Sequence, residues 1–150
     1  MDLFIRQARL SDLDSIYKIE VISFGYEAFS KEFLLEMLFR FPEFFIVAEK
    51  DNKIVGYLSA SIEGYFNKTC HLLSIAVLPE YRNRGIGSLL LKHLIDLVKM
   101  KGMGSIILEV KKDNKPAISV YEKFGFKIVG YKHRYYRDGS DALVMKLKLV

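Results

Sequence analysis

Residues 72–91 read LLSIAVLPEYRNRGIGSLLL, and this stretch joins an apolar run to an amphipathic segment. The run Leu72–Leu78 has the length and the β-branched content that are typical of a buried strand. After Gly87, apolar residues recur at helical spacing, so their side chains share one face of a helix. The stretch therefore predicts a strand, a short turn and an amphipathic helix in direct succession.

The turn at residues 82–87 reads RNRGIG and suits an anionic phosphate. The first N–H groups of a helix lack intrahelical partners and carry partial positive charge. Gly85 and Gly87 allow the backbone to approach a ligand closely, and Arg82 and Arg84 add positive charge. The alternative is that the glycines are ordinary turn residues and the arginines are solvated. The turn predicts a pyrophosphate site if other segments support one.

The composition indicates one domain, which we place over residues 1–150. The chain has 150 residues, of which 51% are hydrophobic, which is enough for one sizeable core and too few for two ordinary domains. The net charge of +5 favours anionic partners in general. Because the basic residues are dispersed along the chain, we expect no nucleic-acid partner.

Targeting, membrane and metal signals are absent from the sequence. No apolar run approaches about 18 residues, and the N-terminus lacks the pattern of a signal peptide. Cys70 is the single cysteine, so an internal disulfide is excluded, and no Cys/His cluster offers a metal site. We therefore expect a cytoplasmic protein without membrane contact or a bound metal.

Turn signals and hydrophobic periodicity predict the element order β-α-α-β-β-β-α-β-α-β-β. This order indicates an α/β (α+β) protein with a mixed sheet and helices on both sides. The expected elements are strand 4–8, a helix opened by Ser11 with Asp14 in its capping box, an irregular segment 23–29, a helix capped by Ser30, strands 44–49, 54–62 and 72–77, the helix that ends near Gly102, strand 105–110, a helix from Pro116 to Gly125, and strands 126–136 and 142–149, which form a hairpin about Asp138 and Gly139.

Three residues in the second half of the chain are candidates for chemistry. Glu109 lies within an apolar strand, where it either faces water or is a general base whose pKa is raised by burial. Asn114 is either the N-cap of the next helix or a ligand-binding amide. Tyr121 is either a core aromatic or a phenol that protonates a leaving group.

The combination of motifs resembles the GNAT acetyltransferases, and within them the RimI-type and archaeal N-terminal protein acetyltransferases. The resemblance covers nearly the whole chain, and the joint pattern is highly specific. The residues that carry it are Ile75-Ala76-Val77, Pro79-x-Tyr81-Arg82-x-x-Gly85-Ile86-Gly87, Leu108-Glu109-Val110, Asn114, Ala117-Ile118, Tyr121, Gly125-Phe126, Tyr135-Tyr136, Asp138-Gly139 and Asp141-Ala142.

The resemblance implies a mixed, mostly antiparallel sheet of about seven strands flanked by four helices. It also implies acetyl-CoA as the cofactor, released as coenzyme A. The residues that it assigns to the cofactor are Ile75, Ala76 and Val77 for the pantetheine arm, Arg82, Asn83, Arg84, Gly85, Ile86, Gly87 and Ser88 for the pyrophosphate, Asn114 beyond the thioester, and Tyr121 beside the departing thiolate.

The same resemblance implies catalytic roles for three residues. Glu109 matches the proton acceptor of RimI-type enzymes, and Tyr121 matches the proton donor. His71 matches a histidine that archaeal relatives place near the amine, although a histidine at a strand start is often a surface residue. The identity of the main base stays open between Glu109, His71 and Glu27.

The acceptor implied by the resemblance is the N-terminus of a protein or peptide, with ribosomal proteins among the candidates. Tyr26, Glu27, Tyr135 and Tyr136 would line the acceptor groove. The segment 23–29 lacks the proline that relatives carry there, so the assignment of Tyr26 and Glu27 can shift by one residue.

Other functions stay open at this point. Acetylation of a small amine or a lysine side chain is the nearest alternative. A non-catalytic acetyl-CoA-binding module is disfavoured by the presence of both Glu109 and Tyr121. Nucleic-acid binding through stacked aromatics is disfavoured by the dispersed charge. We expect a monomer or a weak homodimer.

Overall fold

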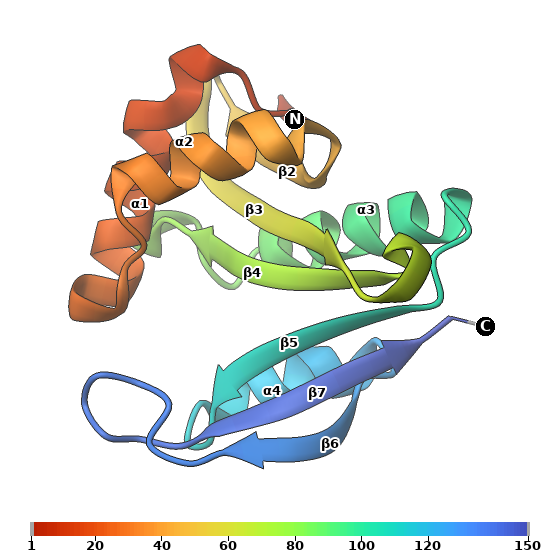
Figure 1. Ribbon diagram of the computed structural model, residues 1–150. Coiled ribbons are helices and arrows are strands. Elements are labelled where there is room, and N and C mark those ends of the chain that lie inside the picture. Colours follow the sequence, from red (N-terminus) through yellow and green to blue (C-terminus); the bar gives the residue numbers. More distant parts are fainter. Residues whose placement is uncertain (1, 150) are drawn as a thin grey trace. The chain divides into compact units, whose positions relative to one another are not determined.

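The computed structural model describes residues 2–149, which contain seven strands and four α-helices (Figure 1). Their order confirms the predicted sequence of elements. The elements are β1 (Leu3–Gln7), α1 (Leu13–Phe24), α2 (Lys31–Arg40), β2 (Phe45–Lys50), β3 (Lys53–Glu63), β4 (Thr69–Val77), α3 (Ile86–Met100), β5 (Ser105–Lys111), α4 (Lys115–Lys123), β6 (Lys127–Lys132) and β7 (Ala142–Lys148).

The strands are hydrogen-bonded in the order β1-β2-β3-β4-β5-β7-β6. The pairs β1/β2, β2/β3, β5/β7 and β6/β7 are antiparallel, whereas β4 pairs with β5 in parallel. This confirms the expected mixed, mostly antiparallel sheet. The chain forms two compact units, one with residues up to Ser61 and Leu72–Asp96, the other with Ile62–His71 and residues from Leu97 onward.

The core of the first unit lies between α1, α2 and the strands they cover. Figure 1 shows these two helices on one side of β2 and β3 and α3 on the other. Strand alternation explains the division, because Tyr57 packs into the cluster with α1 and α2 while its neighbour Gly56 faces Leu90 of α3. The buried residues of this cluster are Ala8, Leu13, Ile16, Ile19, Leu34, Met37, Leu38, Phe45, Val47, Tyr57, Ala76 and Leu78.

The second unit is built on β5, β7 and β6, with α4 against one side of β5 and β7 (Figure 1). Gly125, at φ +99°, lets the chain leave α4, and a Cβ atom there would lie 3.3 Å from the Leu147 side chain. Tyr121 packs on Phe126 with ring centroids 5.7 Å apart.

Burial raises the pKa of the Cys70 thiol of β4 to about 12, so this cysteine stays protonated at neutral pH.

The first helix begins later than the sequence predicts. Ser11 does not cap it: a 3-10 turn over Leu10–Asp12 comes first, and α1 begins at Leu13. The Asp12 carboxylate accepts the Arg9 backbone N–H at 2.8 Å and pairs with Arg6 of β1, also at 2.8 Å. Because Arg6 lies on another element, this arrangement is not visible in the local sequence. The second helix is capped as predicted, since Ser30 accepts the Phe33 N–H at 3.0 Å.

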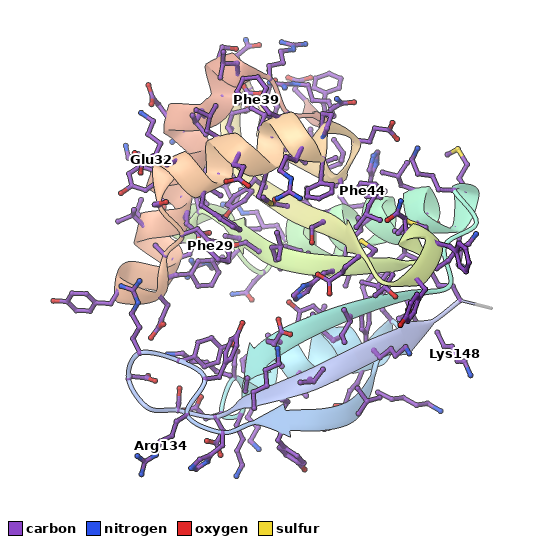
Figure 2. All side chains as sticks on the ribbon, viewed as in Figure 1. Phe29, Glu32, Phe39, Phe44, Arg134 and Lys148 are labelled. Carbon is purple, nitrogen blue, oxygen red and sulfur yellow. The ribbon has the colours of Figure 1, made fainter. Side chains whose placement is uncertain are left out.

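The expected pairing of the last two strands is confirmed, because β6 and β7 are antiparallel, but the predicted extension of the first strand to Tyr136 is wrong. Strand β6 ends at Lys132, so Tyr135 and Tyr136 lie in a loop. Arg134 interrupts the strand because its φ is +49° and its N–H donates to the Asp141 carboxylate at 3.0 Å. Its side chain lies at the outer edge of that loop (Figure 2).

Candidate active site

The turn between β4 and α3 has the backbone shape that its sequence predicts. Gly85 adopts φ +82°, and Asn83 also has a positive φ, of +62°. Arg82 holds the turn against β4, because its Nε donates to the Val77 carbonyl at 2.9 Å. The Arg84 guanidinium lies over the Tyr81 ring, 5.2 Å from the centroid. The two arginines therefore also stabilise the turn itself.

This turn fits an anionic group. The Leu89 N–H donates to the Gly85 carbonyl, so the N–H groups of residues 86–88 come before the first intrahelical hydrogen bond of α3. A Cβ atom at Gly85 would meet no other atom within 4 Å, which shows open space beside the backbone. These features suit a pyrophosphate at the start of a long helix. The cofactor contacts assigned to Arg82–Ser88 and to Ile75–Val77 stay predictions.

A chain of four alternating charges lies in the second unit. His71 Nδ1 is 2.8 Å from Glu63 Oε2, and His71 Nε2 is 2.7 Å from Glu109 Oε1. The Lys132 ammonium donates to Glu109 Oε2 at 3.0 Å. The Glu109 side chain is only 10% exposed, so it is shielded from water by the groups that pair with it.

Strand register explains why His71 and Glu109 meet. His71 of β4 pairs with Ile107 of β5, and Glu109 follows two residues later, on the same face of β5. Lys132 of β6 and Lys111 of β5 both pair with Ala142 of the intervening β7. Glu109 pairs with Val144, two residues further along β7, so this register brings Lys132 near Glu109 across the intervening strand.

The pKa of Glu109 does not follow the sequence expectation. Burial alone would raise the pKa of this carboxyl, as expected, but hydrogen bonds from His71 and Lys132 outweigh burial and lower it. Burial likewise disfavours the charged form of His71, yet its hydrogen bonds to Glu109 and Glu63 raise the pKa of the imidazole. Both ring nitrogens donate only in the imidazolium. This geometry therefore favours a protonated His71 beside an ionised Glu109.

The other predicted residues of the second unit are placed as follows. Asn114 is the N-cap of α4, because its Oδ1 accepts the Ala117 N–H at 3.3 Å. The Tyr121 ring is buried, and burial raises the pKa of its hydroxyl to about 12. Tyr135 lies under the Lys132 ammonium, 5.0 Å from the ring centroid, and contacts Tyr136 edge to face. The structure thus brings Tyr135 to the charge chain, while the catalytic and binding roles stay predictions.

Tyr26 and Glu27 belong to the first unit, as does the turn after β4. Both lie in the 3-10 turn Gly25–Glu27 that follows α1, and Tyr26 is almost fully exposed. Their role in acceptor binding is still a prediction.

Sequence reasoning missed Glu63 and Lys132, the two ends of the charge chain. The local sequence marks neither residue, because both contacts depend on how β3, β4, β5, β7 and β6 are placed.

In the described residues 2–149, no group of three or more His, Cys, Asp or Glu side chains is arranged to hold a metal ion. Within the same range, no helix is long and apolar enough to cross a membrane.

A buried carboxylate in the first unit was also missed. Glu20 of α1 is 1% exposed, and its Oε1 accepts hydrogen bonds from the hydroxyls of Tyr57 and Ser74. Its Oε2 accepts the backbone N–H of Phe29 at 2.9 Å. Glu20 therefore connects the segment before α2 to β3 and β4. The apolar stripe of α1 gave no sign that a glutamate would be inside.

Replacing Glu20 by alanine is expected to lower the free energy of unfolding by about 3 kcal/mol, because the hydroxyls of Tyr57 and Ser74 and the Phe29 N–H lose the carboxylate that accepts from them. Urea unfolding of the wild type and the variant measures the change. Glu20→Gln is the matched control, since its amide can still hydrogen-bond to both sides and should cost less. A loss below about 1 kcal/mol for Glu20→Ala would show that the cluster contributes little to stability.

Comparison with known proteins identifies the family of this chain. Residues 13–126 match the model of the Acetyltransferase (GNAT) family. A relative from Sulfurisphaera tokodaii, named N-alpha-acetyltransferase, is 40% identical, with 97% of this chain and 92% of the relative covered. A Bacillus subtilis relative, named putative [ribosomal protein bS18]-alanine N-acetyltransferase, is 35% identical, with 94% and 92% covered.

Two solved structures share the fold over essentially the full length. Ard1 from Thermoplasma volcanium matches with a TM-score of 0.93 and 31% identity, covering 100% of this chain and 99% of that one. Arabidopsis thaliana Naa50, solved with the bisubstrate analogue CoA-Ac-MVNAL, matches with a TM-score of 0.89 and 25% identity, covering 99% and 100%.

Proposed function

The chain belongs to the acetyltransferase (GNAT) family, and on that premise we propose that it acetylates the free α-amino group of protein N-termini. The observation that carries the proposal is the Glu109 carboxylate, which holds a primary ammonium on one oxygen and His71 on the other. An α-ammonium is the same chemical group as the lysine ammonium now bound there. The names of the relatives from Sulfurisphaera tokodaii and Bacillus subtilis support this acceptor class.

Acetyl-CoA is the acetyl donor, and as a thioester it supplies an activated acyl group. The backbone of Ile75, Ala76 and Val77 would bind its pantetheine arm. The turn Arg82–Ser88 would bind the pyrophosphate, with the open side of Gly85 as the point of closest approach. Asn114 would contact the cofactor beyond the thioester.

Proton handling is assigned to three side chains. A protein α-amino group has a pKa near 8, so at neutral pH most of it must lose a proton before it can attack. Glu109 would accept that proton, directly or through water, and His71 holds the carboxylate in position. Because burial raises the pKa of Tyr121 to about 12, its hydroxyl keeps its proton and would donate a hydrogen bond to the departing thiolate.

The catalytic domain is proposed to comprise residues 1–150 as one functional domain. The family match runs from residue 13 to residue 126 and so includes parts of both compact units. Ribosomal proteins are proposed among the acceptors, as for the Bacillus subtilis relative by its name. A cytoplasmic location, a monomeric or weakly dimeric state, and action without nucleic acid or membrane contact complete the proposal.

The acceptor class can be tested with paired peptides. We expect acetyl transfer to peptides with a free α-amino group and little transfer to the same sequences when that group is blocked and an internal lysine is left free. The physical reason is that a flexible chain end can bring its ammonium to the partly shielded Glu109. Mass spectrometry of both sets locates the acetyl group. Equal labelling of the blocked set would favour the lysine or small-amine alternative.

A further inference from the structure

Lys132 is the more exposed of the two cationic side chains that pair with the Glu109 carboxylate. Glu109 Oε1 is taken by His71, and Oε2 is taken by the Lys132 ammonium at 3.0 Å. The Glu109 side chain is 10% exposed, whereas the Lys132 side chain is 46% exposed. An ammonium that binds Oε2 of Glu109 therefore has to compete with Lys132.

The surroundings of the Lys132 ammonium form a site for a primary ammonium. Glu109 supplies a negative charge and a hydrogen-bond acceptor, and the Tyr135 ring lies 5.0 Å away, within range of a cation–π contact. Lysine Nζ and a peptide α-ammonium both present three N–H donors and one positive charge. The groups that bind one can therefore bind the other.

Charge balance indicates that the site holds one ammonium at a time. Glu63, His71, Glu109 and Lys132 alternate in sign, and the pairing raises the pKa of Lys132, so its ammonium is charged at neutral pH. A second ammonium would place three cations around a single shielded carboxylate, which like-charge repulsion disfavours. Lys132 is the last residue of β6 and its side chain is already half exposed, so its long stem can turn the ammonium into water.

We propose that Lys132 is a gate at the acceptor site: its ammonium occupies the place between Glu109 and Tyr135 that the acceptor's α-ammonium takes, and it swings out when the acceptor binds. This inference rests on the proposed function for the identity of the acceptor. It makes Lys132 a specificity-determining residue, because an entering group must be cationic to replace it without leaving Oε2 of Glu109 unpaired.

Kinetics of Lys132→Met measures the competition. With a short peptide that begins with alanine, the KM for the peptide should fall about three- to tenfold, because no lysine ammonium competes with the peptide for the place between Glu109 and Tyr135. The KM for acetyl-CoA should not change. Lys132→Arg retains a cation and should not lower the peptide KM. Lys127→Met, an exposed lysine on the same strand, is the matched control and should behave as the wild type.

A binding measurement separates the gate from the catalytic proposal. NMR of protein with isotope-labelled lysine Nζ follows the Lys132 ammonium, assigned with Lys132→Arg, while the peptide is added together with coenzyme A. The signal should move toward that of a solvated lysine with the free-amine peptide and stay in place with its Nα-acetylated copy.

An unmoved NMR signal of Lys132 overturns the gate, whatever the activity of the enzyme. An unchanged or raised peptide KM in an active Lys132→Met enzyme also overturns it and leaves the proposed function intact. A wild type that acetylates no peptide N-terminus overturns the proposed function, and the NMR result then decides the ammonium site by itself.

Discussion

Replacing Glu109 by glutamine is expected to lower the turnover number by roughly 10²–10⁴-fold. Glutamine keeps the size of the side chain and an acceptor oxygen for His71, but it has no negative charge to hold an ammonium and no basicity to take its proton. Since the pKa of Glu109 is already lowered by His71 and Lys132, the carboxylate is ionised at neutral pH. Glutamine therefore removes a negative charge that nearly every wild-type molecule carries.

The measurement is the turnover number with a free-amine peptide at saturating acetyl-CoA, with acetyl-CoA affinity followed by calorimetry. That affinity should stay close to the wild-type value, because Glu109 is not among the residues assigned to the cofactor. Glu63→Gln is the matched control: it neutralises the carboxylate on the other side of His71 and should cost less. Retained activity in Glu109→Gln would move the role of base to His71 or Glu27.

Replacing Gly85 by glutamate is expected to abolish acetyl-CoA binding, with an affinity loss on the order of 10²-fold or more, equivalent to about 2.7 kcal/mol. The φ of +82° is strained for any residue with a Cβ atom, and the open side of Gly85 is where the pyrophosphate is proposed to lie. A carboxylate there would occupy the space and repel the phosphates.

Calorimetry on the folded variant tests this prediction. Gly102→Glu is the control, because Gly102 also has a positive φ, of +70°, and open space, but lies beyond the other end of α3. It reports the cost of a glutamate in a strained turn without a charge at the proposed pyrophosphate. Equal affinities for Gly85→Glu and wild type would remove the turn from the cofactor site.

Local sequence signals were sufficient for the elements and for the turn. Each of three features depends only on residues that are close together in the sequence: the apolar run Leu72–Leu78, the glycine-containing turn and the amphipathic α3. The structure contains all three. Ser30 acts as a cap, as expected, and Asn114 takes the N-cap position that was one of its two alternatives, because a cap bonds to a backbone N–H three residues away. The family resemblance rested on these same local motifs.

The charge pairs around Glu109, and with them the direction of its pKa shift, depend on the tertiary structure. Glu109 and His71 are 38 positions apart in the chain, and the parallel register of β4 and β5 brings them to 2.7 Å. The sequence could suggest a buried, high-pKa carboxyl, but it could not show the cations that lower its pKa, because Lys132 reaches it from β6. The same holds for Asp12, which is fixed by Arg6 of β1.

The amino-acid sequence alone was enough to predict the order of the elements, the shape of the turn at residues 82–87, and the set of candidate residues. These depend on side-chain periodicity and on hydrogen bonds between near neighbours in the chain. The charges that face one another around Glu109 and the donors that surround Glu20 could be known only from the folded arrangement of the strands and helices. The physical reason is that electrostatic and buried hydrogen-bond energies depend on distances between groups, and strand pairing sets those distances between residues far apart in sequence.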